Sequence, residues 1–549
     1  MLVDREPEIP QVCVSAGSRY GSALLASSAA RSVYVFACFL MIVISLQWAS
    51  GAYGAEFGGY PDEPAHYVTS LMVRDYIVGL NWGSPVQFAQ DFYHHYPKVA
   101  FGHWPPFFYV LQALWMMLFS TSRVSIRMEV AFTTALLAYS VYREARRWFG
   151  GYLAPILAGL LTVCIPLVQR YTDEEMSDIL LTLLCFWSVI YLARFFDASR
   201  WQDNALFGLC FSLAVLTKGN GWLLAGVAAL AILLTRNLRL VLRRQFWIAP
   251  GIVASLCLPW QLLTLQIAER GWAGENTRNY TFTAFREFGL ILLQVAGIGL
   301  AALGVLGIAV TVLGPVFHRA VKSGPAVMFS LIFCTWLFHA LVPAGVEDRK
   351  MLIAVPAIVL FVFVGGFWLA DRATFGHRFV HWRRRAVAIA GACAFAAGVF
   401  AIPSQRHYGF VEVARFITST PDLWDTTILV SDNSVGEGLL VSEIAMRQPQ
   451  PSSVIVRGTK ALANVDWGGT SYRCLYTTPS QVLQVIDSLH VKLVVVDTFR
   501  GARDLEHNRL LRQALQNARR FQLIRTFNGD SRDGKGQILI YRLKPPASA

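Results

Sequence analysis

Charged residues are scarce in this sequence: they make up 15% of its 549 residues, against 55% for hydrophobic residues. Soluble domains carry about a quarter charged residues, so the deficit argues against a soluble enzyme and indicates a polytopic membrane protein. Long uncharged runs agree, because each reaches roughly the 20 residues that cross a hydrocarbon core. These runs are Ser32–Ala55, Phe149–Gln169, Gln245–Ala268, Phe288–Phe317, Ser323–Val346, Met351–Ala370 and Ala386–Gln405.

Acidic residues are in the minority, which leaves a net charge of +13. The excess does not indicate a nucleic-acid partner, because the arginines gather in short loops between the apolar runs. Such loops face the cytoplasm under the positive-inside rule, so the charge reports topology. The clusters are Arg143, Arg146 and Arg147; Arg236, Arg239, Arg243 and Arg244; and Arg383, Arg384 and Arg385.

Cysteine offers no framework for a metal site or for disulfides. Nine cysteines occur, most of them inside the apolar runs, and no pair has the spacing of a zinc site or of a disulfide-stapled domain. We therefore interpret the cysteines as small packing residues, and the sequence predicts no cysteine-based metal site.

The charge bias predicts a topology of about eleven spans within residues 33–403, with residues 1–32 in the cytoplasm. The first run could also be a signal peptide, but it is longer than a usual signal-peptide core, which favours an uncleaved span. Pro105–Ser122 and Val130–Tyr142 compete for the second span. If both crossed, the later arginine loops would face outside. We therefore expect only the second to cross and the first to lie along the outer interface.

The last part of the chain, residues 404–549, changes to the pattern of a soluble α/β domain, which this topology places outside the membrane. Short β-rich runs alternate there with helical patterns. No glycine-rich phosphate loop and no catalytic-triad motif occurs in it. The runs are TTILVSD, VKLVVVD and GQILIYRL, and one helical pattern is DLEHNRLLRQALQNARRF.

Polar residues in four separate loops are expected on the same outer face. Ionisable groups at a membrane bundle are functional candidates, because they are costly there. Carboxylates and cations facing one cavity could deprotonate an acceptor and hold a phosphate leaving group. The candidates are Asp62, Glu63 and His66; His103 with Trp104; Asp173, Glu174, Glu175 and Asp178; Lys218; and Glu347, Asp348, Arg349 and Lys350.

Each candidate also has a structural interpretation. The Asp62-Glu63-Pro64 stretch is typical of a helix start, with an acid near the N-cap and proline in the first turn. His66 could be a packing histidine, and Lys218 could be a snorkelling lysine at a helix–helix turn. Arg349 and Lys350 could be ordinary charges at the end of a span. These alternatives stay open from the residues alone.

Several stretches in residues 30–400 resemble, in family order, the GT-C glycosyltransferases related to protein O-mannosyltransferases and to the bacterial lipid A aminoarabinose transferase. The Asp-Glu pair, the Pro-Pro-aromatic segment, the aspartate that opens span four and the Thr-Lys-Gly turn are specific in combination. The stretches are YPDEPAHYV, FGHWPPFFYVLQALWMMLFS, SIRMEVAF, RRWFGGYLAPILAGLL, MSDILLTLL, FGLCFSLAVLTKG and DRKMLIAVPAIVL.

The resemblance implies a mainly α, GT-C-like bundle that transfers a sugar, with inversion, from a polyprenyl-phosphate donor to a lipid, glycan or protein acceptor. It implies Asp62 as the base or as the acid that positions the acceptor, Glu63 as its neighbour in the motif and Asp178 as a second acid. Lys218 and Arg349 match cation positions near the donor phosphate, and Lys350, His66 and His103 are expected beside the substrate.

One departure concerns the residue before Pro-Pro, where relatives carry His, Lys or Glu. This chain has Trp104 there and His103 one place earlier, so neither a phosphate nor a metal role is assigned to that position. The paired acids could hold a divalent cation, but their spacing defines no site.

Two other functions fit part of the pattern. A transporter or flippase of lipid-linked saccharides would also use charges within the membrane, and a noncatalytic assembly subunit would use the outer domain for binding. The enzyme is favoured, because no internal repeats are evident and the acids are tightly placed. We expect a bacterial inner-membrane protein with its site in the periplasm.

Overall fold

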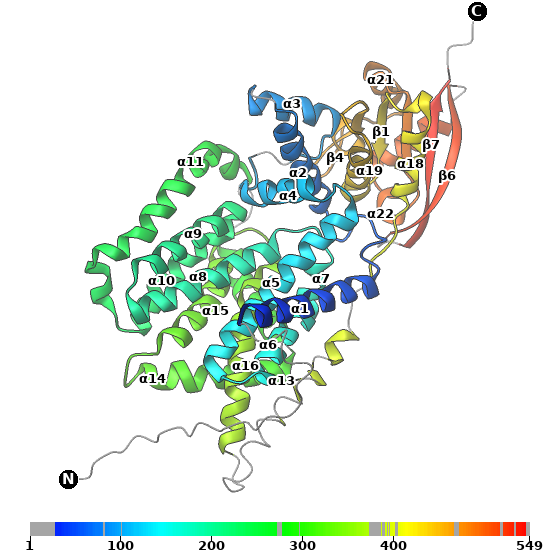
Figure 1. The fold of residues 1–549 in the computed structure, drawn as a ribbon. Coiled ribbons are helices and arrows are strands. Elements are labelled where there is room, and N and C mark those ends of the chain that lie inside the picture. Colours follow the sequence, from blue (N-terminus) through cyan, green and yellow to red (C-terminus); the bar gives the residue numbers. More distant parts are fainter. Residues whose placement is uncertain are drawn as a thin grey trace, which may run out of the picture.

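The computed structural model describes most of the chain between residues 28 and 544 (Figure 1). Most of the expected N-terminal segment, the Arg383–Arg385 loop and parts of the expected last span lie outside the described residues. The gaps are residues 81–82, 100–101, 272–276, 296, 373–385, 387–389, 392, 395, 401–403, 466–470, 517–519 and 532–533.

A bundle of apolar helices makes up the larger part of the molecule, so the expected mainly α class is confirmed. Within the described residues seven helices are long and apolar enough to cross a membrane, or eight if one bent pair counts as a span. The expected count of eleven is therefore not confirmed. The seven are Ala29–Ser50, Arg123–Phe149, Asp178–Ala198, Arg244–Ile267, Ile298–Val316, Ser323–Leu341 and Asp348–Arg372, and the bent pair joins Leu153–Cys164 to Pro166–Thr172.

The boundaries of these helices follow local signals. The longest begins where the Ser122 hydroxyl accepts the backbone N–H of Ser125, and it ends at Gly150, whose φ of +66° suits glycine. Proline at position 166 separates the bent pair, which turns by 64°. The helices of this part are α1 (Ser28–Ser50), α5 (Arg123–Phe149), α6 (Leu153–Cys164), α7 (Pro166–Thr172), α8 (Asp178–Ala198), α9 (Trp201–Thr217), η1 (Gly219–Trp222), α10 (Leu223–Leu234), η2 (Leu238–Leu242), η3 (Arg244–Trp247), α11 (Ile248–Gly271), α12 (Thr277–Val295), α13 (Ile298–Ile308), η4 (Ala309–Leu313), α14 (Gly314–Val316), α15 (Ser323–Leu341), η5 (Asp348–Ala354) and α16 (Val355–Arg372).

Two helices fall short of the spans expected of them. The eleven-span topology counts residues 204–235 as two spans that turn at Lys218. In the structure these residues form α9, with 17 residues, and α10, with 12, separated at Lys218 by the short helix η1. The turn between them therefore lies where the sequence indicated, but neither helix reaches the length of a full span.

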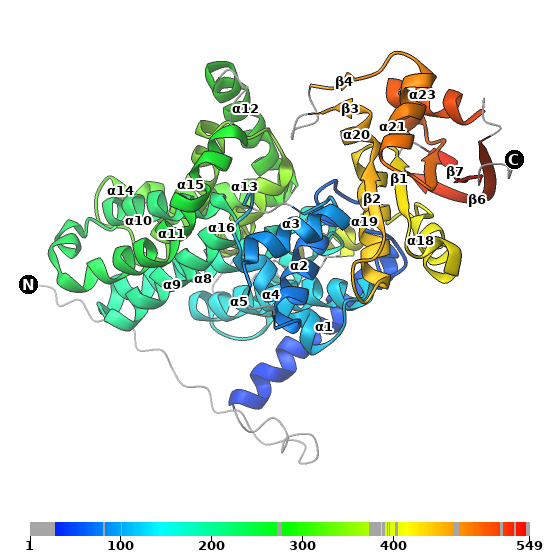
Figure 2. The same cartoon turned by 90° about the horizontal axis from the view of Figure 1, so that it is seen from above.

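Three shorter helices leave the bundle after α1: α2 (Glu63–Val78), α3 (Pro85–His95) and α4 (Phe107–Leu118). Helix α4 is apolar but has only 12 residues, whereas α5 has 27. This difference in length agrees with the expectation that only the second of the two competing segments crosses. Figure 2 shows α2, α3 and α4 between the bundle and the C-terminal part of the chain.

The C-terminal part contains the expected α/β fold. A five-stranded sheet has the order β2-β1-β5-β7-β6, in which β2, β1 and β5 are parallel and β7 and β6 are antiparallel. Its elements are α18 (Phe410–Ser419), η7 (Pro421–Leu423), β1 (Thr427–Ser431), α19 (Ser434–Arg447), β2 (Val454–Arg457), α20 (Gly458–Ala461), β3 (Ala463–Asn464), β4 (Arg473–Cys474), α21 (Pro479–Ser488), β5 (Leu493–Asp497), α22 (Arg500–Arg503), α23 (Glu506–Gln516), β6 (Phe521–Ser531) and β7 (Gly534–Leu543).

The sheet is docked on α2 through α19, and the two helices share one apolar core with α3. Polar contacts reinforce this interface. The Tyr96 hydroxyl donates to Gln448 at 2.6 Å, and Arg123 lies 3.1 Å from the buried carboxylate of Glu443. The loop that follows α1 is therefore held between the bundle and the α/β domain.

Candidate functional site

The loop between α1 and α2 carries the two adjacent acids, and α2 begins at the second of them. Asp62 occupies the N-cap position in a helical conformation (φ −83°, ψ −22°), and within the described residues its side chain makes no capping hydrogen bond. Pro64 lies in the first turn, where its missing N–H costs nothing. The helix therefore starts without using the carboxylate of Asp62, which stays one-quarter exposed.

Glu63, in contrast, is sealed inside the protein. Its carboxylate lies 3.0 Å from the guanidinium of Arg127, and both side chains have no exposed surface. The same carboxylate accepts the backbone N–H groups of Tyr60 at 2.9 Å and of Glu175 at 2.6 Å. A Cβ at Gly59 would come within 2.9 Å of this carboxylate, so glycine is needed there. Glu63 thus holds both the loop that contains Tyr60 and the loop that contains Glu175 in place.

Arg349, in the first turn of η5, connects this helix to Asp62. Its Nη1 lies 3.4 Å from Asp62 Oδ2, and its Nε and Nη2 bind Glu347 at 2.9 and 3.1 Å. The guanidinium also lies over the ring of Tyr60, 4.2 Å from the centroid, and the Tyr60 hydroxyl donates to Glu347. This planar, stacked and forked arrangement suits arginine and not lysine.

Asp178 and Lys218 form the second pair of opposite charges. The ammonium of Lys218 lies 2.8 and 3.0 Å from the two carboxylate oxygens of Asp178. Asp178 opens α8, and Lys218 ends α9 in an extended conformation (φ −158°, ψ 139°) that directs the chain into the turn. Lys218 is therefore paired at the helix turn and does not merely snorkel toward solvent.

The two pairs and His66 lie within one electrostatic neighbourhood. The charge of Arg349 interacts with the charges of both Asp178 and Asp62. The charge of Lys218 interacts with those of Asp178 and Arg349. Burial, together with the nearby cations Lys218 and Arg349, lowers the pKa of His66 to about 3 against the opposing effect of Asp178. Residues from the first loop and from the starts of α8, η1 and η5 therefore meet at the same end of the bundle.

His66 also packs against neighbouring aromatic side chains. Its ring is buried, lies 4.3 Å from the ring of Trp104 and has Nδ1 2.9 Å from the Tyr109 hydroxyl. Trp104, at the position that departs from the family pattern, therefore supports the helix that starts at Asp62. His103 is exposed, and partial burial lowers its pKa.

Lys350 and Asp348 are directed to other partners. The ammonium of Lys350 binds the carbonyl oxygens of Ala344 and Gly345 at 2.6 and 2.5 Å, so it holds its own loop. Asp348 accepts from Arg170 at 3.2 Å and from the Tyr171 hydroxyl at 2.9 Å, which ties η5 to α7. Among the described residues Lys350 forms no ion pair, although it lies close enough to Glu347 and Asp178 for their charges to act on it.

The candidate residues named from the sequence did not include Arg127, Glu129 and Gln112. Arg127, the partner of Glu63, and Glu129 both lie in the long apolar helix α5. The amide of Gln112 donates both to Glu129 and to Glu175, and these side chains are buried. Burial raises the pKa of Glu175 well above its usual value, and the negative Glu129 raises it further. Charged residues inside an apolar helix were the available signal.

A divalent cation finds no site at these carboxylates within the described residues. The one group of possible metal ligands in that part of the chain is Glu56, His407 and Glu412. The carboxylate of Glu56 already accepts the backbone N–H groups of Tyr408 and Gly409, both at 2.8 Å, at the start of α18. Glu56 therefore caps a helix of the α/β domain, and His407 bridges it to Glu412.

Comparison with known proteins agrees with the resemblance seen in the sequence. Residues 103–262 match the model of the dolichyl-phosphate-mannose-protein mannosyltransferase family. No curated protein is detectably similar in sequence to this chain.

Solved structures cover nearly the whole chain at low identity. ArnT from Cupriavidus metallidurans bound to undecaprenyl phosphate has a TM-score of 0.58 at 14% identity and covers 93% of this chain and 98% of its own. The Archaeoglobus fulgidus oligosaccharyltransferase in complex with zinc and sulfate has 0.55 at 15%, with 84% and 68% covered. The mycobacterial arabinofuranosyltransferase AftD has 0.51 at 15%, with 95% and 42% covered. The chain has the fold of the GT-C membrane glycosyltransferases, which confirms the expected resemblance.

Proposed function

We propose that this GT-C-fold membrane protein is an inverting glycosyltransferase that moves a sugar from a polyprenyl-phosphate donor to an acceptor. The observation that carries the proposal is the convergence of Asp62–Arg349 and Asp178–Lys218 at one end of the bundle. The solved ArnT structure binds undecaprenyl phosphate, which supports a lipid phosphate as the donor's leaving group. The reaction is assigned to the face on which the α/β domain sits, which we take to be the periplasmic face.

Asp62 is the proposed base. Its side chain is 25% exposed, whereas the side chains of Glu63 and Asp178 are 0% and 3% exposed. An acceptor hydroxyl can therefore reach Asp62 from outside, and the other two acids are occupied by Arg127 and Lys218. In the proposed step the hydroxyl proton passes to Asp62 while the acceptor oxygen bonds to the anomeric carbon. A positioned base contributes about 10²–10⁴-fold to such a rate.

The cations are assigned to the leaving group. As the bond between the anomeric carbon and the phosphate oxygen breaks on the opposite side of the sugar, negative charge grows on the phosphate. Lys218 and Arg349 are held by Asp178 and by Glu347, so they are positioned before the donor arrives, which is the condition for effective electrostatic stabilisation. Asp178 acts as a positioning residue in this scheme.

Glu63 and Lys350 take supporting roles. Glu63 fixes the loop that presents Asp62 by binding Arg127 and two backbone N–H groups. Lys350 fixes the loop that presents Arg349 by binding two carbonyl oxygens. His66 and Trp104 pack under the first turn of α2.

Mass spectrometry of glycolipids and envelope polymers from a strain that lacks this protein tests the proposal. We expect one sugar modification to disappear and to return with the wild-type chain. Loss of the sugar together with accumulation of the lipid-linked saccharide on the cytoplasmic side alone would support a transporter instead, and a complete set of sugars would contradict the proposal.

A further inference from the structure

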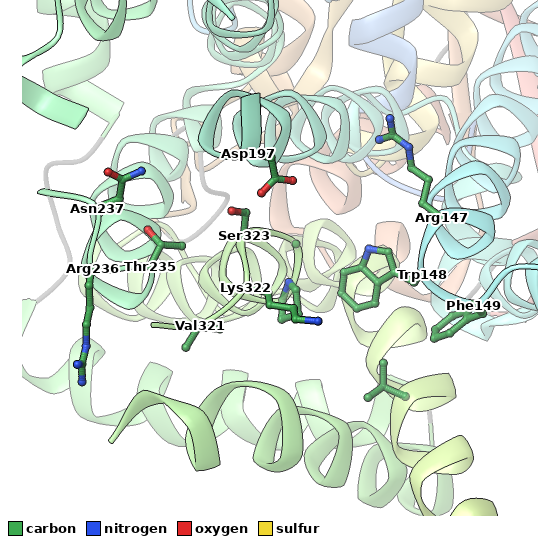
Figure 3. Close-up of a pocket in the computed structure, with 13 residues that line it drawn as sticks. Arg147, Trp148, Phe149, Asp197, Thr235, Arg236, Asn237, Val321, Lys322 and Ser323 are labelled. Carbon is green, nitrogen blue, oxygen red and sulfur yellow. The ribbon is translucent and has the colours of Figure 1, made fainter. Parts of the chain in front are cut away.

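A cavity lies at the end of the bundle opposite the two charge pairs. Its volume is about 690 Å³, and it is formed where α5, α8 and α10 end and where α15 begins (Figure 3). Asp178 and Asp197 lie at the two ends of α8, roughly 28 Å apart at 1.5 Å per residue. The cavity is therefore separated from the proposed transfer site by about the thickness of a hydrocarbon core.

The lining of the cavity carries more positive than negative charge. Arg147, Arg236 and Lys322 stand against Asp197, which leaves two positive charges. Lys322 has no ion-pair partner among the described residues, whereas Arg147 lies 3.3 Å from Glu144. Figure 3 shows Lys322 extending across the cavity toward Trp148, with Arg147 on the far side of that ring. An anion in the cavity would gain Lys322 without breaking an existing ion pair.

One wall of the cavity is apolar, whereas Thr235, Asn237 and Ser323 add uncharged polar groups to the rest of the lining. Trp148, Phe149 and Val364 form the apolar wall, and Trp148 is fixed by a 3.0 Å hydrogen bond to Glu144. A Cβ at Gly324 would lie 3.2 Å from the Trp148 ring, so the start of α15 packs closely on it. Tryptophan and aliphatic side chains next to cations are typical of the depth where a headgroup meets acyl chains.

We propose that this cavity binds the headgroup of an anionic phospholipid of the cytoplasmic leaflet. The phosphate would contact Lys322 at the start of α15, and the glycerol end would rest on Trp148 and Val364. The volume lies within the usual range of small-ligand sites, roughly 300–1,000 Å³. The apolar wall favours a lipid over a soluble phosphate, and basic pockets between spans are known headgroup sites.

Binding to phosphatidylglycerol tests the proposal on the full-length protein. Lys322→Gln and Lys322→Glu are compared with Arg200→Gln and Arg200→Glu, because Arg200 is an exposed cation at the same end that does not line the cavity. Native mass spectrometry counts the retained lipids, and titration in mixed micelles gives their affinity. Removing one cation should weaken binding about fivefold, with a larger loss for the glutamate variant. The Arg200 variants should match the wild type.

A thermal-shift series separates the sources of the phosphate. Phosphatidylglycerol should raise the Tm of the wild type, and phosphatidylcholine should not. Lys322→Gln should reduce the shift while the Tm without added lipid stays unchanged. Equal protection by inorganic phosphate, or an equal loss in the Arg200 and Lys322 variants, would overturn the proposal.

Discussion

Asp62 and Glu63 are neighbours in the chain but belong to different environments. The carboxylate of Asp62 is one-quarter exposed and faces Arg349 at 3.4 Å, whereas that of Glu63 is fully buried against Arg127 at 3.0 Å. The two residues begin the same helix, so their side chains leave it in different directions. Asp62 is therefore available to a substrate, whereas Glu63 holds the loop.

Glu63→Gln should damage folding more than chemistry. The substitution leaves Arg127 buried without its countercharge, and breaking a buried ion pair costs about 3–5 kcal/mol. We expect a lower yield and a lower Tm, with near-normal turnover in the fraction that folds. Fluorescence-detected size exclusion measures the yield. A variant that folds as well as the wild type but transfers no sugar would place Glu63 in the catalytic step.

Changing Lys218 and Asp178 together should separate their effect on stability from their effect on activity. Lys218→Met strands the buried carboxylate of Asp178 and should lower the Tm. The double variant Lys218→Met, Asp178→Asn removes both charges and should recover the Tm but not the transfer. Recovery of transfer in the double variant would return the pair to a purely structural role.

Arg349→Lys should raise the donor KM while the protein stays folded. Lysine keeps the charge but cannot bind Glu347 through two nitrogens and lie over Tyr60 at the same time. Loss of one charge-assisted contact costs about 1.5–3 kcal/mol, or roughly ten- to over a hundredfold in affinity. Initial rates measured over a series of donor concentrations give the donor KM. An unchanged KM would remove Arg349 from the donor site.

The contact between His407 and Glu56 should make docking of the α/β domain depend on pH. Hydrogen bonding to Glu56 raises the pKa of His407 from 6.5 to about 9, against the opposing effect of burial. Because the folded-state pKa is the higher one, this stabilisation is complete below about pH 6.5 and is lost as pH rises through 9.

The Tm of the wild type should therefore fall more between pH 6 and 9.5 than that of His407→Gln. His94→Gln serves as the control, since His94 is an exposed histidine on α3. Parallel pH profiles for the wild type and His407→Gln would rule out the contact as a source of stability.

Local patterns predicted much of the fold. The break at Lys218 and Gly219, the short helix α4 and the strands of the C-terminal domain all follow from residues close together in sequence. The eleven-span count is not confirmed within the described residues, because apolarity does not reveal where a helix such as α10 stops after 12 residues.

The site was predictable as a set of loops but not as a set of contacts. Glu63 could not be assigned to Arg127, which lies 64 residues away on another helix. Lys350 follows Arg349 directly, yet the short helix η5 directs it to the carbonyl oxygen of Ala344. Such choices are made by tertiary packing, so adjacent charges in the sequence need not share a role.

Complementation with Asp62→Asn tests the central claim most directly. The carboxylate makes no capping hydrogen bond within the described structure, so asparagine should leave the helix start and the Tm unchanged. Asp75→Asn, at the other end of α2, is the matched control. Mass spectrometry of the envelope should show the missing sugar restored by the wild type and by Asp75→Asn. At matched expression, Asp62→Asn should restore about 1% or less, the loss expected of a general base. Full restoration by Asp62→Asn would contradict the assignment of Asp62 as the base.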